Sequence, residues 1–167
     1  MKVVLFDLGK TLEDGDVLLP GARETLQAIQ AMRDSNGKAA VLGLVSDFDK
    51  PDNPEQIPFI QQRYYELLDK LGIRSFFEPV ADRVTLSTEV GVFKPDEKIF
   101  RAVIEKIDEG LSFQDVLFVT ENHGHVLEAR HLGMKGVHFK GPGQNSGEVD
   151  RLVELVPLIR RFLGPPD

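Results

Sequence analysis

Short apolar runs alternate with amphipathic stretches along the chain, and this alternation constrains the fold more than any other feature of the sequence. The runs are uninterrupted and rich in β-branched residues. They cover residues 3–6, 40–45, 116–119 and 136–139, with a weaker candidate at 83–86. Strands that are covered on both faces typically have this continuous apolar pattern. We therefore expect a sheet buried between two layers of helices.

The stretches between these runs place apolar residues at helical spacing. The four stripes are Ala22, Leu26, Ile29 and Met32; Ile60, Tyr64, Leu67 and Leu71; Ile99, Val103, Ile104 and Ile107; and Leu152, Leu155, Val156, Ile159 and Phe162. Gly72 and Gly133 follow helical patterns, where glycine commonly forms a left-handed cap, and Pro157 should break or kink the last helix. This order predicts an α/β, Rossmann-like three-layer sandwich with a parallel sheet.

The chain has no internal repeat and no change of composition that would mark a boundary, so we expect a single domain over residues 1–167. The Asp- and Pro-rich stretch 47–58 is expected to be a loop, and residues 164–167 a loose tail.

Composition excludes several classes of protein. The net charge of −7 argues against a nucleic-acid-binding surface, and the absence of cysteine excludes disulfides and thiolate zinc sites. The first apolar run is too short for a signal peptide, and no stretch approaches the ~18 apolar residues of a membrane helix. We expect a cytoplasmic protein that binds neither nucleic acid nor membranes.

Polar residues stand where the expected strands end, at the sheet edge where ligands bind in such folds. Asp7 follows the first strand, Ser46 ends the second and Glu121 follows the fourth, while Lys94 stands in a turn just ahead of a helix. Each residue alone has a simpler explanation, as a turn former, a helix cap or a solvated charge. The set of acid, hydroxyl, lysine and acid, each at or beside the carboxyl end of a strand, favours a functional site over these separate explanations.

Four segments resemble the motifs of the haloacid-dehalogenase-type (HAD) phosphohydrolases. FDLGKTL (6–12) is similar to the first motif, Asp-x-Asp-x-Thr/Val after an apolar strand, and LGLVS (42–46) to the second. STEVGVFKPDEKIF (87–100) is close to the segment around the family's lysine, and VTENHGHVLEARHLGM (119–134) has the frame of the fourth motif. The resemblance covers nearly the whole chain and implies a HAD-type fold.

The resemblance also implies a role for each residue. Asp7 would attack the phosphorus of a phosphate monoester and become an aspartyl-phosphate, while Lys94 pairs with Asp7 and Ser46 donates to a phosphoryl oxygen. The backbone N–H groups of Leu8 and Gly9 would complete the phosphate cradle. Mg²⁺ would be held by the Asp7 and Glu121 carboxylates and the Gly9 carbonyl, which are the oxygen ligands that this ion prefers.

Three positions depart from the family pattern. Gly9 stands where most family phosphatases have a second Asp that transfers protons, although a family variant with glycine at this position exists; Glu121 replaces an Asp, and His125 stands where another Asp is usual. Two interpretations stay open: a Mg²⁺-dependent phosphatase that is slow, or an impaired pseudo-phosphatase that binds phosphate, metal or a partner. The pair His123 and His125 is weak evidence for zinc, because the two histidines are spaced by one residue and no cysteine stands nearby.

The resemblance finally bears on the substrate. Many family members insert a cap domain after the first or second motif, and neither interval of this chain has room for one. We therefore expect no separate cap, and an open site for a large or macromolecular phosphorylated substrate, or one screened by a partner chain. The loop 47–58, with Asp47 and Asp49, is the candidate lid. The missing cap disfavours dehalogenation and phosphonate hydrolysis.

Overall fold

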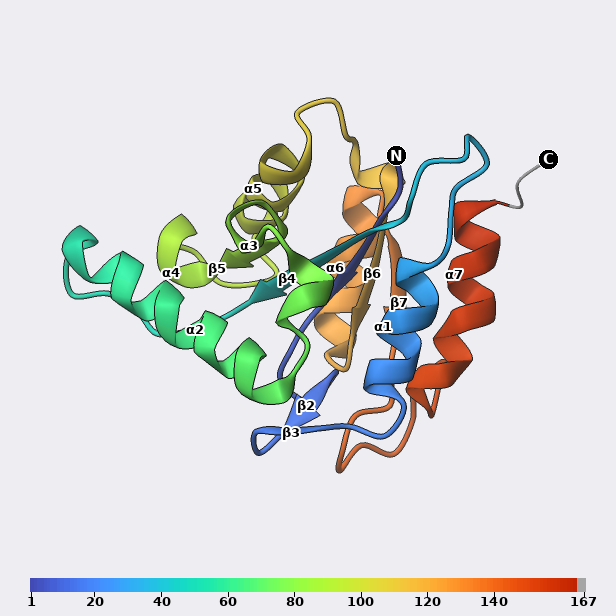
Figure 1. The fold of residues 1–167 in the computed structure, drawn as a ribbon, viewed down its shortest axis with the longest axis horizontal. Helices are drawn as coiled ribbons and strands as arrows, with labels where there is room; N and C mark the ends of the chain where they lie inside the picture. Colours follow the sequence, from blue (N-terminus) through green and yellow to red (C-terminus); the bar gives the residue numbers. More distant parts are fainter. Residues whose placement is uncertain (165–167) are drawn as a thin grey trace.

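A five-stranded parallel sheet forms the centre of the computed structural model, which describes residues 1–164 (Figure 1). The strands are β1 (Val3–Phe6), β4 (Val41–Ser46), β5 (Val84–Leu86), β6 (Val116–Thr120) and β7 (Lys135–His138), in the order β5-β4-β1-β6-β7. All adjacent strands pair in parallel, and β1 lies between β4 and β6. The expected α/β sandwich is confirmed, with strand bounds within one residue of those expected.

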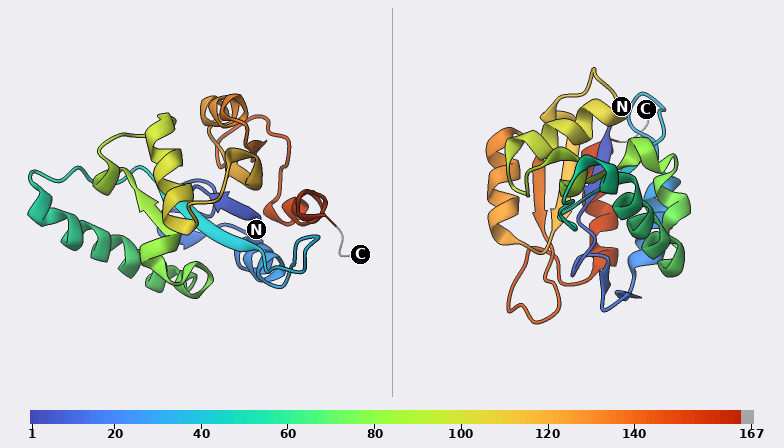
Figure 2. Two further views of the ribbon diagram at one scale, coloured as in Figure 1. Left: turned by 90° about the horizontal axis from the view of Figure 1, so that it is seen from above. Right: turned by 90° about the vertical axis from the view of Figure 1, so that its left-hand side faces the viewer.

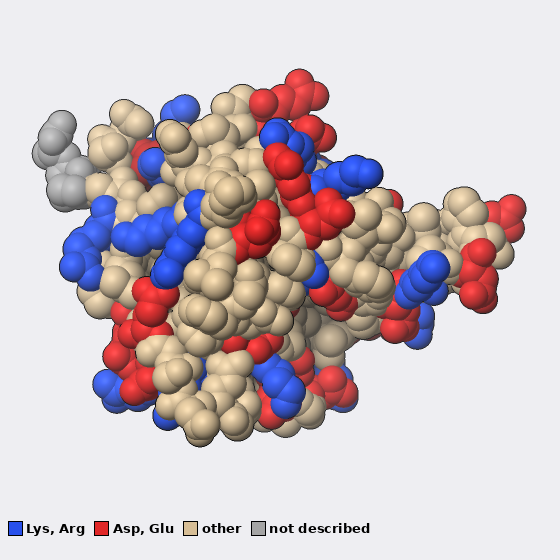
Figure 3. Space-filling model, turned by 180° about the vertical axis from the view of Figure 1, so that it is seen from behind, with Lys and Arg blue, Asp and Glu red and all other residues tan. Residues whose placement is uncertain are grey.

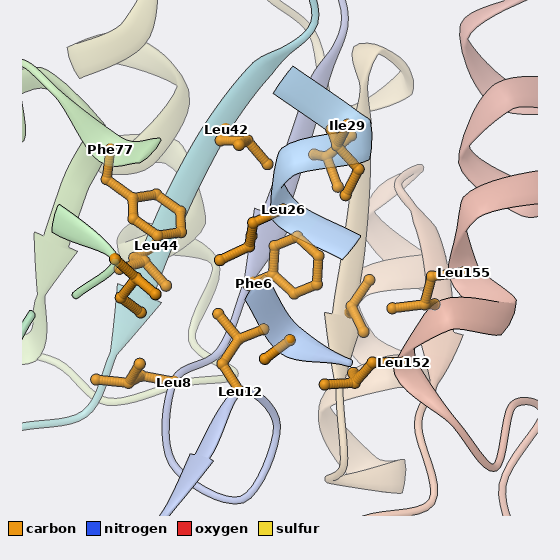
Figure 4. Close-up of a cluster of buried hydrophobic side chains, with 14 of the residues drawn as sticks. Phe6, Leu8, Leu12, Leu26, Ile29, Leu42, Leu44, Phe77, Leu152 and Leu155 are labelled. Carbon is orange, nitrogen blue, oxygen red and sulfur yellow. The ribbon is translucent and has the colours of Figure 1, made fainter. Parts of the chain in front are cut away.

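Helices cover both faces of the sheet (Figure 2). One face packs against α1 (Ala22–Gln30), α2 (Ile57–Leu71) and α7 (Leu155–Leu163), the other against α5 (Glu97–Ile107) and α6 (His123–Leu132). Successive strand residues point to opposite faces, so Val4 and Phe6 enter the first core while Val3 and Leu5 enter the second. Figure 4 shows the ring of Phe6 surrounded by side chains of α1 and α7. This packing fixes the end of β1, where Asp7 follows.

Short elements fill the connections. The helices α3 (Val80–Arg83) and α4 (Ser87–Val90) flank β5, and 3₁₀ turns cover Pro54–Gln56, Arg74–Phe77, Phe113–Asp115 and Leu152–Glu154. The helix α2 projects beyond the β5 edge of the sheet (Figures 1 and 2). Gly72 and Gly133 cap α2 and α6 with φ of 70° and 107°, as predicted.

Two expectations about proline-containing segments are wrong. Pro157 neither breaks nor kinks its helix, because α7 begins at Leu155 and the proline lies in its first turn, where N–H groups have no partner within the helix. The stretch 47–58 is not loop throughout. It ends in the 3₁₀ turn Pro54–Gln56 and the first residues of α2, with Pro54 and Pro58 at helix starts, where proline is favoured.

A small hairpin was not predicted. The strands β2 (Glu13–Asp14) and β3 (Val17–Leu18) pair antiparallel around Gly15 and Asp16, whose φ values of 57° and 61° are those of a type I′ turn. Two-residue strands are too short to give a periodic pattern. The hairpin lies beyond the end of β1 (Figure 1), a few residues after Asp7 in the sequence.

The surface seen in Figure 3 carries acidic and basic side chains next to one another, and several Lys and Arg side chains gather at the end of the molecule where the C-terminal helix lies. Within residues 1–164, no helix combines the length and apolar character that a membrane crossing needs. The predicted tail begins at Gly164, and its remaining residues, 165–167, lie outside the described part of the chain.

Candidate active site

The carboxyl ends of β1, β4 and β6 meet at one edge of the sheet and open into a cavity of about 370 Å³. Because these strands are neighbours, the residues that follow them converge, although they are far apart in sequence. The cavity is lined by Asp7, Leu8, Gly9, Glu13, Ser46, Asp47, Phe48, Tyr64, Leu67, Lys94, Glu121, Asn122 and His125. All residues that the sequence singled out for phosphate and Mg²⁺ binding lie in this set, whereas Asp49 of the candidate lid and His123 do not.

Asp7 and Lys94 form a buried ion pair at the bottom of the cavity. The Lys94 ammonium donates to Oδ1 of Asp7 over 2.7 Å and to the Val45 carbonyl over 3.3 Å. The Lys94 side chain is only 3% exposed and the Asp7 side chain only 11% exposed. A buried ammonium is costly unless paired, so this contact holds both groups in place. Asp47 fixes the lysine from its backbone, since Oδ1 of Asp47 accepts the Lys94 N–H at 2.8 Å.

The remaining contacts of Asp7 orient its carboxylate. The Leu8 N–H donates to Oδ1 over 2.9 Å, and the Thr120 hydroxyl donates to Oδ2 over 3.4 Å. The Leu8 N–H, expected in a phosphate cradle, therefore binds the neighbouring carboxylate in this structure. Thr120 ends β6 and is fully buried.

Ser46 shares its hydroxyl with a tyrosine. The Ser46 Oγ and Tyr64 Oη atoms are 2.6 Å apart, and the ring of Phe48 packs edge-on against that of Tyr64. Burial raises the pKa of the Tyr64 phenol, which the bond to Ser46 only partly offsets, so the phenol keeps its proton. The sequence placed Tyr64 only in the apolar stripe of α2; its position in the site was missed, because spacing cannot separate a core tyrosine from a site tyrosine.

Glu121 stands across the cavity from the ion pair and is held by a loop residue. The amide of Gln144 donates to Oε2 of Glu121 over 3.0 Å and to its carbonyl over 2.7 Å. Burial and the nearby charge of Asp7 raise the pKa of Glu121. Gln144, in the loop after β7, was not predicted, since no motif marks it.

The histidines are separated by the fold. His125 lines the cavity, where burial and then the Lys94 charge lower its pKa, so that its imidazole is neutral near pH 7. His123 instead packs against His138, with ring centroids 5.1 Å apart. Within residues 1–164, no three His, Asp or Glu side chains are grouped to hold a metal ion, so the zinc interpretation gains no support.

Glu13 enters the cavity from the hairpin and was also missed. A Cβ built on Gly9 would lie 3.6 Å from Oε1 of Glu13, so this carboxylate stands beside the position where the family pattern has its second Asp. The Asp16 N–H donates to the other oxygen, Oε2, over 3.0 Å. Burial raises the pKa of the Glu13 carboxyl, and the Asp16 bond lowers it in part.

Among the comparisons with known proteins, the solved structures bear on the fold. No family model matches the chain. Drimenol cyclase drtB of Aspergillus calidoustus is 34% identical over 107 residues, which are 64% of this chain; the chain spans only 17% of that protein. Among solved structures, a HAD phosphatase from Thermococcus onnurineus is 16% identical with a TM-score of 0.65, over 95% of this chain and 98% of that one.

Two further structures extend the likeness. A HAD-superfamily hydrolase from Ehrlichia chaffeensis is 15% identical with a TM-score of 0.67, over 98% of this chain and 100% of that one. The putative HAD-hydrolase YfnB of Bacillus subtilis, bound to magnesium, is 17% identical with a TM-score of 0.65, over 87% of this chain and 57% of that one. The chain therefore has the α/β fold seen in these HAD-superfamily hydrolases.

Proposed function

We propose that this chain is a HAD-type phosphohydrolase that cleaves a phosphate monoester through an aspartyl-phosphate at Asp7. One observation carries the proposal: the carboxylate of Asp7 and the ammonium of Lys94 are paired over 2.7 Å at the base of an open cavity. A carboxylate is a weak nucleophile, but phosphoryl transfer depends on placement and charge neutralisation more than on basicity.

The side chains around Asp7 divide the work of holding the phosphate. The Lys94 ammonium offsets the negative charge of the incoming phosphoryl group, and the Ser46 hydroxyl donates to one of its oxygens. The Leu8 N–H and the Thr120 hydroxyl keep the carboxylate of Asp7 turned so that one oxygen can reach phosphorus. The Gly9 N–H is the further cradle donor.

The charges of the cavity fit a hard divalent cation such as Mg²⁺. Four carboxylates line it, those of Asp7, Glu13, Asp47 and Glu121, against the ammonium of Lys94. A phosphate dianion would be repelled by this surplus of negative charge. The Asp7 and Glu121 carboxylates, with the Gly9 carbonyl, are the groups that would hold the ion. When bound, Mg²⁺ supplies positive charge that offsets the phosphate and the carboxylates.

The open cavity supports a proposal about the size of the substrate. Within residues 1–164 the cavity is lined by the loop after β1, the short hairpin, the segment after β4, α2, the turn at Lys94 and the segment from the end of β6 into α6, and these elements form no separate cap over it. A large or macromolecular phosphate ester, or a substrate screened by a partner chain, suits such a site. The cyclase activity in the name of drtB belongs to a much longer protein and is not carried over.

A beryllofluoride soak tests the proposal, because Mg²⁺ and beryllofluoride together imitate an aspartyl-phosphate. We expect density bonded to the Asp7 carboxylate in the wild type, and Mg²⁺-dependent release of phosphate from p-nitrophenyl phosphate that Asp7→Asn abolishes. The exposed Asp150, changed to Asn, is the matched control and should leave both results unaltered. A wild type that binds Mg²⁺ and phosphate but never releases phosphate would instead support the pseudo-phosphatase.

A further inference from the structure

The glycine at position 9 leaves the proposed reaction without an acid at its usual place. An alkoxide leaving group departs slowly without a proton, and general acid–base help is typically worth ~10²–10⁴-fold in rate. The inference below rests on the proposed function, and it concerns which group of this chain supplies that proton.

The backbone places Glu13 firmly beside Gly9. The Glu13 N–H donates to the Leu8 carbonyl over 3.2 Å, and its own carbonyl accepts the Lys10 N–H at 2.6 Å. Gly9 and Glu13 also form a β-bridge. The turn between them therefore brings a residue four positions further along the chain back to the side of Gly9.

The side chain of Glu13 reaches the space that Gly9 leaves open. Its Oε1 is the nearest atom to a Cβ built on Gly9, at 3.6 Å, and a carboxylate carried by position 9 would extend into the same region of the cavity. The Asp16 N–H anchors Oε2 over 3.0 Å. Within the described part of the chain, Oε1 accepts no hydrogen bond, so it is available to a ligand.

The other acids near the cavity lie further from position 9, because none of their atoms comes within 4 Å of a Cβ built on Gly9. Asp47 accepts the Lys94 N–H, Glu121 is held by Gln144, and Asp14 is paired with Lys10 over 3.4 Å on the outer side of the hairpin. His125 lies at the start of α6, at the end of β6, and not beside Gly9. Among these groups, Glu13 alone combines a fixed backbone, an unoccupied oxygen and a place next to position 9.

We propose that Glu13 is the catalytic acid and base of this site, in place of the acid that Gly9 lacks. In the first half-reaction an Asp7 oxygen bonds to phosphorus, the ester P–O bond breaks, and the departing oxygen takes the proton of the Glu13 carboxyl. In the second, a water oxygen bonds to phosphorus and gives its proton to Glu13 while the Asp7–phosphorus bond breaks. One water is consumed, and Glu13 ends protonated, as it began.

The test compares two esters in the presence of Mg²⁺: an alkyl phosphate, whose leaving group needs a proton, and p-nitrophenyl phosphate, whose leaving group departs as a stable anion. Glu13→Gln should lower kcat on the alkyl phosphate by about 10²-fold or more. On p-nitrophenyl phosphate, Glu13→Gln should leave the formation of the aspartyl-phosphate fast and slow its hydrolysis. The first turnover should therefore give a burst of p-nitrophenolate equal to the enzyme concentration. Asp14→Asn, on the same strand, is the matched control and should change neither.

A rescue variant separates chemistry from structure. Gly9 has no positive φ and a Cβ there meets only ordinary van der Waals contact, so the backbone accepts a side chain at this position. The double variant Glu13→Gln/Gly9→Asp should hydrolyse the alkyl phosphate at least tenfold faster than Glu13→Gln does. Two outcomes would overturn the role of Glu13 while leaving the proposed function standing. In one, Glu13→Gln leaves the Asp7-dependent hydrolysis of both esters unchanged; in the other, it reduces both rates equally, with no burst and no rescue. No Asp7-dependent hydrolysis in the wild type overturns this inference and the proposed function together.

Discussion

The hydroxyl of Ser46 has one proton, and its partner decides where that proton points. If Ser46 donated to Tyr64, nothing would remain for a phosphoryl oxygen. The raised pKa of Tyr64 keeps the phenol protonated, so the phenol can donate across the 2.6 Å contact and leave the serine proton free for the ligand. Tyr64 is therefore a positioning residue for Ser46.

Removing the phenol hydroxyl of Tyr64 should weaken phosphate binding more than it affects the fold. A neutral hydrogen bond contributes about 1 kcal/mol, so Tyr64→Phe should raise KM and the inhibition constant for inorganic phosphate roughly three- to tenfold. Steady-state kinetics with phosphate as inhibitor measures both constants. Tyr65→Phe, which changes the adjacent, half-buried tyrosine of α2, is the control. An equal effect of both substitutions would remove the special role of Tyr64.

Among the connecting elements, the turn between α1 and β4 depends on a buried carboxylate. Oδ1 of Asp34 accepts the N–H groups of Asn36 and Lys38 at 2.9 and 3.0 Å. Burial raises the pKa of Asp34, but these two bonds, together with the N-terminal ammonium, outweigh it and lower the pKa overall. The folded state thus favours the anion, and the turn is strongest when Asp34 is ionised.

The sign of the pH dependence follows from that lowered pKa. Stability from Asp34 is fully present above the ordinary Asp pKa of about 3.9 and is lost as the pH falls through the folded value. Asp34→Asn should therefore lower the free energy of unfolding at pH 7, and its difference from the wild type should shrink below about pH 4. Urea unfolding between pH 7 and pH 3 measures this, with Asp150→Asn as control. A difference that stays constant with pH would contradict it.

The elements that the sequence predicted are those whose apolar residues repeat over several turns or fill a whole strand. The strand β1 was predicted without error because Val3–Phe6 is buried on both faces. The β2–β3 hairpin was missed because its strands have two residues each, and Glu13 was missed with it. Asp7, Ser46 and Glu121 could be placed at one sheet edge because each ends or follows an expected parallel strand, and Lys94 could be added through the family motif around it. Gln144 could not be placed, because its loop has no pattern.

At the scale of the whole molecule, the acidic cavity has consequences for stability. Four carboxylates and one ammonium are held together only in the folded chain. Their mutual repulsion disfavours the folded state; at Glu121, burial first and then the charge of Asp7 raise the pKa of the carboxyl group. A cation that enters the cavity relieves this repulsion, and the unfolded chain has no equivalent site. Binding should therefore be visible as a change in global stability, independent of any catalysis.

We expect Mg²⁺ to raise the melting temperature. At a concentration of ten times Kd, binding to the folded state alone contributes about 1.4 kcal/mol, which in a domain of this size corresponds to a rise of roughly 3–6 °C. Thermal melts at pH 7 with MgCl₂, against NaCl of equal ionic strength, measure the shift. Asp7→Asn should reduce the shift to near zero, whereas Asp14→Asn, outside the cavity, should retain it. If the wild type shows no shift, or if Asp7→Asn shows the same shift, the ion does not bind at Asp7 and Glu121, and the charge of the cavity has to be offset in another way.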